Sequence, residues 1–309
     1  MAVQAHVAYS KTIKGVCGFA AQPVYCAATH FTREPSKSSP AGKGSPFCDG
    51  CIDPLVTNRF DHCRRTPAVV DVGKLPDWPR RNCGQPFRAN CLDDVIHMYD
   101  SRVYLQSGTR DTHTPSDAVA NTFAWYATMV ADPQSQILYS GDLPLPHELP
   151  TLNSTPAFDG PGACLRHLYE RRTGGSFLKP PARAAVPANL HTLDQSSVGA
   201  SAAAGGWAPH GLVYAPAACH APCWKPPCDP PGARCRLHVL MHDCGTREAP
   251  ALPPALSMSP DEEEFARYAE TNSCCSCRGS QAWGRRQQMV PPKLAAALRT
   301  CCCLKMRSM

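Results

Sequence analysis

The chain has 309 residues, among them 19 cysteines, 32 prolines and 21 glycines. Leu, Val, Phe and Ile together contribute 52 residues, about 17% of the chain, whereas sequences that bury a large core usually exceed ~20%. The formal net charge is only +6, without a dense basic block, which disfavours nucleic-acid binding. No run reaches the ~18 apolar residues of a membrane span, and the N-terminus lacks the pattern of a secretory signal.

These features predict a mostly irregular, small α+β chain with a limited core, several short helices and strands, and long disordered segments rich in Pro, Ala and Gly. Composition divides the chain into six segments. They are an irregular N-terminal segment and linker (1–47), a Cys-rich segment (48–97), a small ordered α+β region (98–172), a linker (173–218), a Cys/His cluster (219–244), and a linker with two short helices and a Cys-rich tail (245–309).

A strand–helix–strand unit is predicted within the ordered region. Residues 102–106 alternate in polarity, as a half-buried strand does. Thr114 and Pro115 then suit the N-cap and first position of a helix, whose apolar face begins at Val119 and repeats with helical spacing. Residues 136–139 predict the second strand.

Two later helices are predicted from the same rules. Residues 163–172 carry leucines on one side and charges on the other. Ser259 and Pro260 provide an N-cap and a first helical residue for a helix that continues to Glu270. A further helix is expected from Lys293 to about Leu304.

The densest group of metal-ligand residue types lies in segment 219–244. Cys219 and Cys223 could provide two of the four ligands of a zinc ion. His238 and His242, four residues apart, would share a helix face and provide the other two. The spacing approaches that of a Cys2His2 finger, but Pro-Pro pairs interrupt the region between the two halves. Free thiols in an irregular loop and local disulfides are the alternatives.

A second set of candidate zinc ligands comprises Cys48, Cys51, His62 and Cys63. Cys-x2-Cys with an internal glycine can bring two sulfurs to one side of a turn. A second pair at regular spacing is missing, so unpaired cysteines are the alternative. In both sets the ion would be structural and would supply folding energy that the thin core lacks.

The C-terminal tail contains Cys301, Cys302 and Cys303 beside basic residues. Cysteines in such a setting can be S-acylated, which would anchor the chain at a membrane surface without a transmembrane segment. The alternative is an unmodified tail.

Catalytic signatures are weak. No G-x-S-x-G, H-E-x-x-H, phosphate-binding loop or dinucleotide glycine pattern is present. Asp93 and Asp94 near His97 resemble a carboxylate–imidazole group, although such residues more often form the solvated side of a short element. His147-Glu148 lacks the second histidine of a metalloprotease helix.

The sequence therefore predicts a non-enzymatic interaction or regulatory protein with an unidentified protein partner, stabilised by a structural zinc site. A reading frame without specific activity and a membrane-peripheral protein tethered through its C-terminal cysteines are the competing hypotheses. A cytoplasmic or nuclear location is expected because no secretory signal is evident. In such a reducing compartment, dense cysteine is more typical of metal binding than of disulfides.

Overall fold

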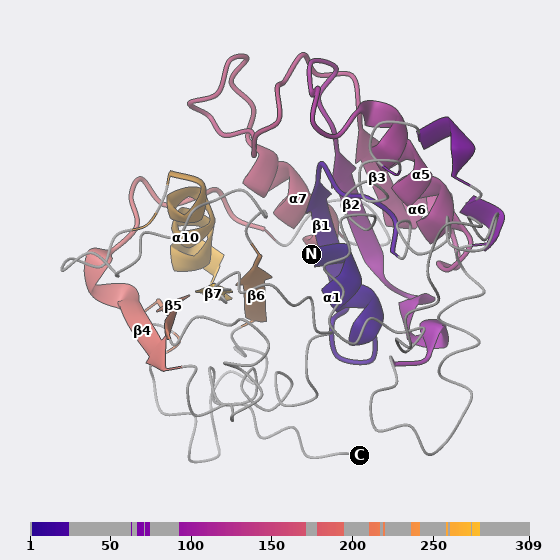
Figure 1. The fold of residues 1–309 in the computed structure, drawn as a ribbon. Coiled ribbons are helices and arrows are strands. Elements are labelled where there is room, and N and C mark those ends of the chain that lie inside the picture. Colours follow the sequence, from indigo (N-terminus) through magenta and orange to yellow (C-terminus); the bar gives the residue numbers. More distant parts are fainter. Residues whose placement is uncertain are drawn as a thin grey trace, which may run out of the picture. The chain divides into compact units, whose positions relative to one another are not determined.

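The computed structural model divides between Phe158 and Asp159 into two compact units (Figure 1). The residues that it describes are 2–24, 63, 67–70, 72–74, 93–170, 178–194, 210–216, 219, 236–241, 258, 260–272 and 274–278. None of the helices in these ranges is long and apolar enough to cross a membrane. The mixed helix and strand content agrees with the predicted α+β class.

The first unit is organised around a parallel sheet of three strands, in the order β1-β2-β3. The strands are β1 (Gly15–Phe19), β2 (Arg102–Gln106) and β3 (Ile137–Ser140). The last residues of the strands lie in register, since Phe19 pairs with Gln106 and Gln106 pairs with Ser140. The carboxyl ends of all three strands therefore stop level at one edge of the sheet.

Helix α5 (Ser116–Ala127) connects β2 to β3 and confirms the predicted strand–helix–strand unit. The N-cap is Pro115, one residue later than expected. The backbone N–H of Thr114 is instead bonded to the Asp111 carboxylate at 2.7 Å. The helix and a short one after it, α6 (Pro133–Gln136), make the crossover that a parallel pair of strands requires.

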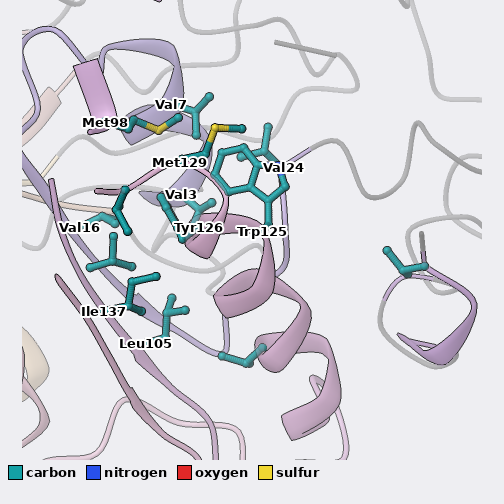
Figure 2. Close-up of a cluster of buried hydrophobic side chains, with 14 of the residues drawn as sticks. Val3, Val7, Val16, Val24, Met98, Leu105, Trp125, Tyr126, Met129 and Ile137 are labelled. Carbon is teal, nitrogen blue, oxygen red and sulfur yellow. The ribbon is translucent and has the colours of Figure 1, made fainter. Parts of the chain in front are cut away.

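The core of the first unit lies between the sheet, α5 and α1 (Ala2–Ala8), as Figure 2 shows. Trp125 and Tyr126 are completely buried and meet edge to face, with ring centroids 4.9 Å apart. Val103 and Leu105 of β2 are also fully buried. Large aromatic rings compensate for the scarcity of aliphatic residues, because each buries far more area than a valine or alanine.

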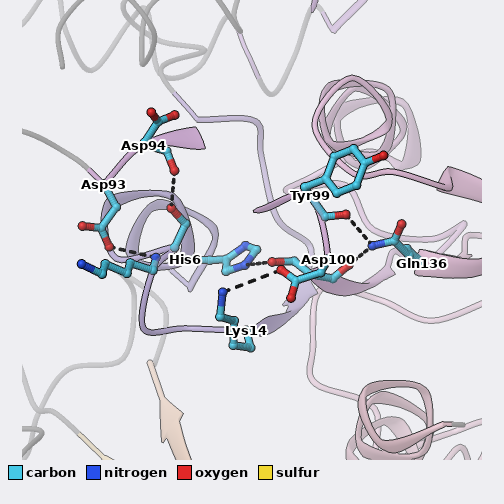
Figure 3. Close-up of polar contacts among 10 residues, drawn as sticks. His6, Lys14, Asp93, Asp94, Tyr99, Asp100 and Gln136 are labelled. Carbon is cyan, nitrogen blue, oxygen red and sulfur yellow. Dashed lines mark hydrogen bonds and ion pairs between the residues drawn. The ribbon is translucent and has the colours of Figure 1, made fainter. Parts of the chain in front are cut away.

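Three short 3-10 helices complete the described part of this unit: η2 (Pro67–Val69), η3 (Val72–Lys74) and η4 (Val95–Met98). Asp94 caps η4 by accepting a hydrogen bond from the Ile96 amide at 3.0 Å. Asp93 accepts one from the Lys11 amide at 2.9 Å. Both carboxylates beside His97 thus have structural roles, since Asp94 caps η4 and Asp93 joins the start of η4 to the turn after α1 (Figure 3).

The second unit contains a mixed sheet in the order β4-β5-β7-β6, in which only the β6–β7 pair is parallel. Its elements are α7 (Gly160–Tyr169), η5 (Pro187–Asn189), β4 (Leu190–Asp194), β5 (His210–Tyr214), β6 (Arg236–Leu240), α10 (Pro260–Asn272) and β7 (Cys274–Arg278). Leu190, Leu212 and Tyr214 pack with two alanines of α10 in a second, smaller core.

Sequence reasoning located α10 well but misplaced other parts of this unit. Helix α7 begins at Gly160, three residues early, because Asp159 caps it by accepting a hydrogen bond from the Gly162 amide. Strands β4 and β5 fall inside segment 173–218, which was expected to be a linker. Their stability comes from antiparallel pairing with each other, which a window of local sequence does not reveal.

A buried polar cluster centred on His6 connects α1 to the rest of the first unit. The His6 ring is hydrogen-bonded to the Tyr126 hydroxyl at 2.9 Å and to the Ser101 hydroxyl at 3.1 Å. Figure 3 shows the ring between α1 and the segment before β2. Burial, with a smaller contribution from Lys14, lowers the pKa of His6 from 6.5 to about 3. The ring is therefore neutral in the folded chain at ordinary pH.

We expect this cluster to make the first unit sensitive to mild acid. Between pH 3 and 6.5 the unfolded chain binds the His6 proton and the folded chain does not. Stability is therefore fully present above pH 6.5 and should fall by about 1.4 kcal/mol for each pH unit below it. Urea unfolding at pH 7 and pH 5 measures the change. His6→Gln should flatten this dependence, whereas His97→Gln should retain it; an unchanged slope in His6→Gln would contradict the assignment.

Candidate active site

Three connections leave the carboxyl edge of the parallel sheet. They begin at Ala20 after β1, at Ser107 after β2 and at Gly141 after β3. Ligands of open parallel sheets bind outside the carboxyl ends of the strands. This edge is therefore where the first unit would carry a site.

The connections after β2 and β3 are joined by backbone hydrogen bonds. The Thr109 amide donates to the Leu143 carbonyl at 2.8 Å, and the Arg110 amide donates to the Leu145 carbonyl at 3.2 Å. The Arg110 guanidinium donates to the Pro144 carbonyl at 2.6 Å. The two loops run side by side and hold their following residues in fixed relative positions.

A glycine allows this close approach. A Cβ atom at Gly108 would lie 1.9 Å from the Leu145 carbonyl oxygen and 2.6 Å from its carbon. Both atoms belong to the backbone, so no side-chain rotation could relieve the overlap. Gly108 is therefore required where the loop after β2 meets the loop after β3.

The joined loops bring Asp111 and His147 together. Oδ2 of Asp111 lies 2.8 Å from Nδ1 of His147. Oδ1 of the same carboxylate accepts hydrogen bonds from the amides of His113 and Thr114, at 2.8 and 2.7 Å. The Asp111 side chain is 1% exposed, whereas that of His147 is 29% exposed. A buried, fully bonded carboxylate thus holds an imidazole that reaches solvent.

This pair has the geometry of a positioned general base. A neutral imidazole that donates from Nδ1 to a carboxylate carries its lone pair on Nε2. The carboxylate fixes the ring orientation and stabilises the imidazolium that forms when Nε2 takes a proton. The His113 ring packs against His147 with centroids 5.1 Å apart.

The first residue after β1 has an unusual backbone conformation. Ala20 has φ 51°, and among the described residues it is the one non-glycine with positive φ. Its amide donates to the Gln106 carbonyl at 2.8 Å, so the turn begins directly at the end of the paired strand. A positive φ costs an L-residue roughly 1–2 kcal/mol, and such strain concentrates at functional positions.

A strained turn directly after a parallel strand is the arrangement called a nucleophile elbow, in which G-x-S-x-G presents a serine above the sheet. The sequence here is Gly18-Phe19-Ala20-Ala21-Gln22. Gly18 matches the first glycine, and a Cβ there would come within 2.7 Å of the Ala21 Cβ atom. The central position holds alanine and the second glycine position holds Gln22, so the strained residue after the strand is present while the serine and the second glycine are not.

Sequence reasoning missed this site. A search for G-x-S-x-G fails because position 20 is alanine and position 22 is glutamine, and His147 was considered only as part of a metalloprotease motif. The available signal was positional. The predicted strands at 102–106 and 136–139 belong to a strand–helix–strand unit, and parallel strands of such a unit bring the residues that follow them to one sheet edge, an inference that the sequence predictions did not include.

The predicted zinc site at Cys219, Cys223, His238 and His242 is not formed as expected. Cys219 is disulfide-bonded, so its sulfur is not available as a thiolate ligand. His238 lies on strand β6, not on a helix, and its ring is hydrogen-bonded to the Tyr169 hydroxyl. Cys223 and His242 lie outside the described residues.

In the second predicted set, Cys63 is also disulfide-bonded and buried. Cys48, Cys51 and His62 lie outside the described ranges, as do the candidate acylation sites Cys301, Cys302 and Cys303. Within the described residues, no group of three or more His, Cys, Asp or Glu side chains could hold a metal ion. The expectation of a zinc-binding protein is therefore corrected.

The disulfides also contradict the assumption of free thiols on which the zinc prediction depends. Cys17, Cys63, Cys164 and Cys219 are each disulfide-bonded. Disulfides persist chiefly in oxidising compartments. These four cysteines therefore give no support to metal binding in a reducing compartment. The cytoplasmic or nuclear location stays a prediction.

Comparisons with known proteins find polyester depolymerases. A poly(3-hydroxybutyrate) depolymerase of Delftia acidovorans is 28% identical over 259 residues, which cover 79% of this chain and 43% of that protein. The chain thus spans less than half of this relative. A crystal structure of PHB depolymerase from Penicillium funiculosum shares the fold, with TM-score 0.56 and 18% identity over 90% of this chain and 74% of that one.

A serine-to-alanine variant of a PHB depolymerase complexed with an R3HB trimer gives the same coverage and identity, with TM-score 0.53. No family model matches the chain. The depolymerase relatives point to an enzyme, so the prediction of a non-enzymatic interaction or regulatory protein is wrong.

The role of Gly108 gives a direct test of the site geometry. We expect Gly108→Ala to force the loop after β2 away from Leu145, at a cost of about 1–3 kcal/mol in unfolding free energy, and to change the NMR shifts of the His147 ring. Gly141→Ala is the comparison variant, because its Cβ would meet side-chain atoms of Tyr139 (the hydroxyl oxygen at 2.5 Å and ring carbon Cζ at 2.6 Å) and no backbone atom among its nearest neighbours. Equal losses in both variants would contradict the assignment.

Proposed function

We propose that the chain hydrolyses ester bonds of polyesters of the 3-hydroxybutyrate type, with His147 as general base and Asp111 as its orienting carboxylate. The observation that carries the proposal is the 2.8 Å contact between Asp111 and His147 at the carboxyl edge of the parallel sheet. The depolymerase relatives supply the substrate class.

An ester presents two proton-transfer problems to an enzyme. The attacking oxygen must lose a proton as it bonds to the carbonyl carbon, and the departing alkoxide must gain one. A single imidazole with a pKa near neutrality can take the first proton and deliver it to the leaving oxygen. The partly exposed His147 ring, fixed by a buried carboxylate, suits this task.

The order of the residues along the chain supports an α/β-hydrolase-like arrangement. In that class the elbow comes first, the carboxylate second and the histidine third. Here the turn at Ala20, Asp111 and His147 follow β1, β2 and β3 in the same order. All three belong to the first unit.

Hydrolysis of an R3HB trimer, followed by chromatography of the released acids, tests the proposal. Asp111→Asn and His147→Ala should each lower the rate at least a hundredfold, because general acid–base catalysis typically contributes ~10²–10⁴-fold. Asp111→Asn removes the charge that orients the imidazole, and His147→Ala removes the base itself. Neither substitution enlarges a side chain.

His97→Ala is the control, since His97 lies on η4 at the opposite end of β2 from the site. It should retain the wild-type rate. Hydrolysis that persists unchanged in His147→Ala would contradict the proposal, as would a folded wild-type chain that leaves the trimer intact.

A further inference from the structure

The loop that carries His147 is poor in backbone hydrogen-bond donors. It connects β3 to α7 and contains neither helix nor strand. Between residues 144 and 156 it has four prolines, Pro144, Pro146, Pro150 and Pro156. Each proline keeps its carbonyl acceptor but has no backbone N–H. Acceptors therefore outnumber donors in this loop, and donors from elsewhere in the chain can hold it in one conformation.

Arg110, in the loop after β2, supplies such donors. Its backbone amide donates to the Leu145 carbonyl at 3.2 Å. Its guanidinium donates from Nε to the Pro144 carbonyl at 2.6 Å and from Nη2 to the Thr155 carbonyl at 3.3 Å. Since His147 lies between Pro144 and Thr155 in the chain, one planar group bonds to the loop on both sides of the histidine.

The carbonyl of Thr155 belongs to a compact turn. The amides of Ser154 and Phe158 both donate to the Thr151 carbonyl, at 3.0 and 3.1 Å. The Ser154 hydroxyl in turn accepts a hydrogen bond from the Thr151 amide at 2.9 Å. Arg110 therefore joins this turn to the segment at Pro144, and the separation of the two attachment points is limited to the span of one guanidinium group.

Resting on the proposed function, we infer that Arg110 is a positioning residue for His147: its guanidinium closes the loop around the histidine and so holds the imidazole against Asp111. Asp111 follows Arg110 directly in the chain, and its Oδ2 lies 2.8 Å from Nδ1 of His147. The residue that binds the loop and the residue that orients the ring are thus adjacent. The role of Arg110 is exerted through His147 and requires no contact with the ester.

The two side-chain contacts use the planar geometry of a guanidinium. This group carries five N–H donors in a fixed arrangement and stays charged. A lysine ammonium is a point charge on a flexible chain and has no such fixed pair of donors. Arg110→Lys should therefore retain the charge but lose the simultaneous contact with Pro144 and Thr155.

The first measurement needs no substrate. The NMR signal of the Nδ1 proton of His147, identified by its loss in His147→Ala, reports the hydrogen bond to Asp111. Arg110→Ala should shift or broaden this signal, and guanidinium chloride, added far below its denaturing range, should restore it by taking the place of the missing side chain. Arg183→Ala, which removes an exposed arginine of the second unit, is the matched control and should leave the signal unchanged. Circular dichroism confirms that each variant is folded.

The second measurement is steady-state hydrolysis of the R3HB trimer. Because a small misplacement of a reacting group can cost ~10²-fold in rate, Arg110→Ala should lower kcat by about tenfold to a hundredfold. KM should stay unchanged, since the substitution moves the ring and removes no contact with substrate. Arg110→Lys should give a kcat between those of Arg110→Ala and the wild-type chain. Guanidinium chloride should raise the rate of Arg110→Ala several-fold, whereas sodium chloride at the same ionic strength should not.

Three results would overturn the inference. An unchanged Nδ1 signal with a wild-type kcat in folded Arg110→Ala would show that the guanidinium does not position His147. A raised KM with unchanged kcat would make Arg110 a substrate-binding residue. Equal losses in Arg110→Ala and Arg110→Lys, without rescue by guanidinium, would show that the two carbonyl contacts are not the cause. Where Arg110→Ala does not fold, the signal and kcat of Arg110→Lys decide in the same way.

Failure of this inference and failure of the proposed function are distinguishable. If the His147 signal responds to Arg110→Ala and to guanidinium but no chain cleaves the trimer, the positioning role stands and the proposed function fails. If His147→Ala abolishes hydrolysis and Arg110→Ala leaves it unchanged, the proposed function stands and the inference fails.

Discussion

The in-register ending of three parallel strands is the constraint on which the site depends. Parallel strands present their carboxyl ends at one edge, so residues far apart in sequence can converge there without any local motif. Phe19, Gln106 and Ser140 are neighbours across the sheet. The strained turn, the carboxylate loop and the histidine loop all start from this line. A slip of one residue would also reverse the side chains of a strand and expose its core face.

Burial of the Asp111 carboxylate explains how two loops without secondary structure can hold their side chains in fixed positions. Its two oxygens are used by two backbone amides and one imidazole. A buried charge is tolerated only when it is fully hydrogen-bonded, so the loop conformation and the position of His147 are linked. The amide of Thr114, directly before the cap of α5, is one of these donors, so the start of the helix is tied to the same carboxylate.

The sequence predicts the elements that local residue patterns determine, and it does not predict those that depend on contacts between residues far apart in the chain. Strand β2, helix α5 and helix α10 follow from alternation, helical spacing and proline at the first turn. Strands β4 and β5 gain their stability from pairing with each other, so composition suggested a linker. The site itself was missed because Ala20 and Gln22 replace the serine and the final glycine by which the elbow motif is recognised. The zinc prediction failed for a related reason, because the fold and not the spacing along the chain determines which groups the cysteines bond to.

The buried neutral His6 has a consequence for the polyester hydrolysis proposed above. Each ester bond cleaved in a 3-hydroxybutyrate polyester yields a carboxylic acid, and in a weakly buffered medium that acid accumulates beside the protein that cleaves it. Helix α1, which carries His6, leads directly into β1 and the turn at Ala20. A protein of this design would lose its own scaffold as its product builds up, so the extent of degradation would be limited by the buffering capacity of the surroundings.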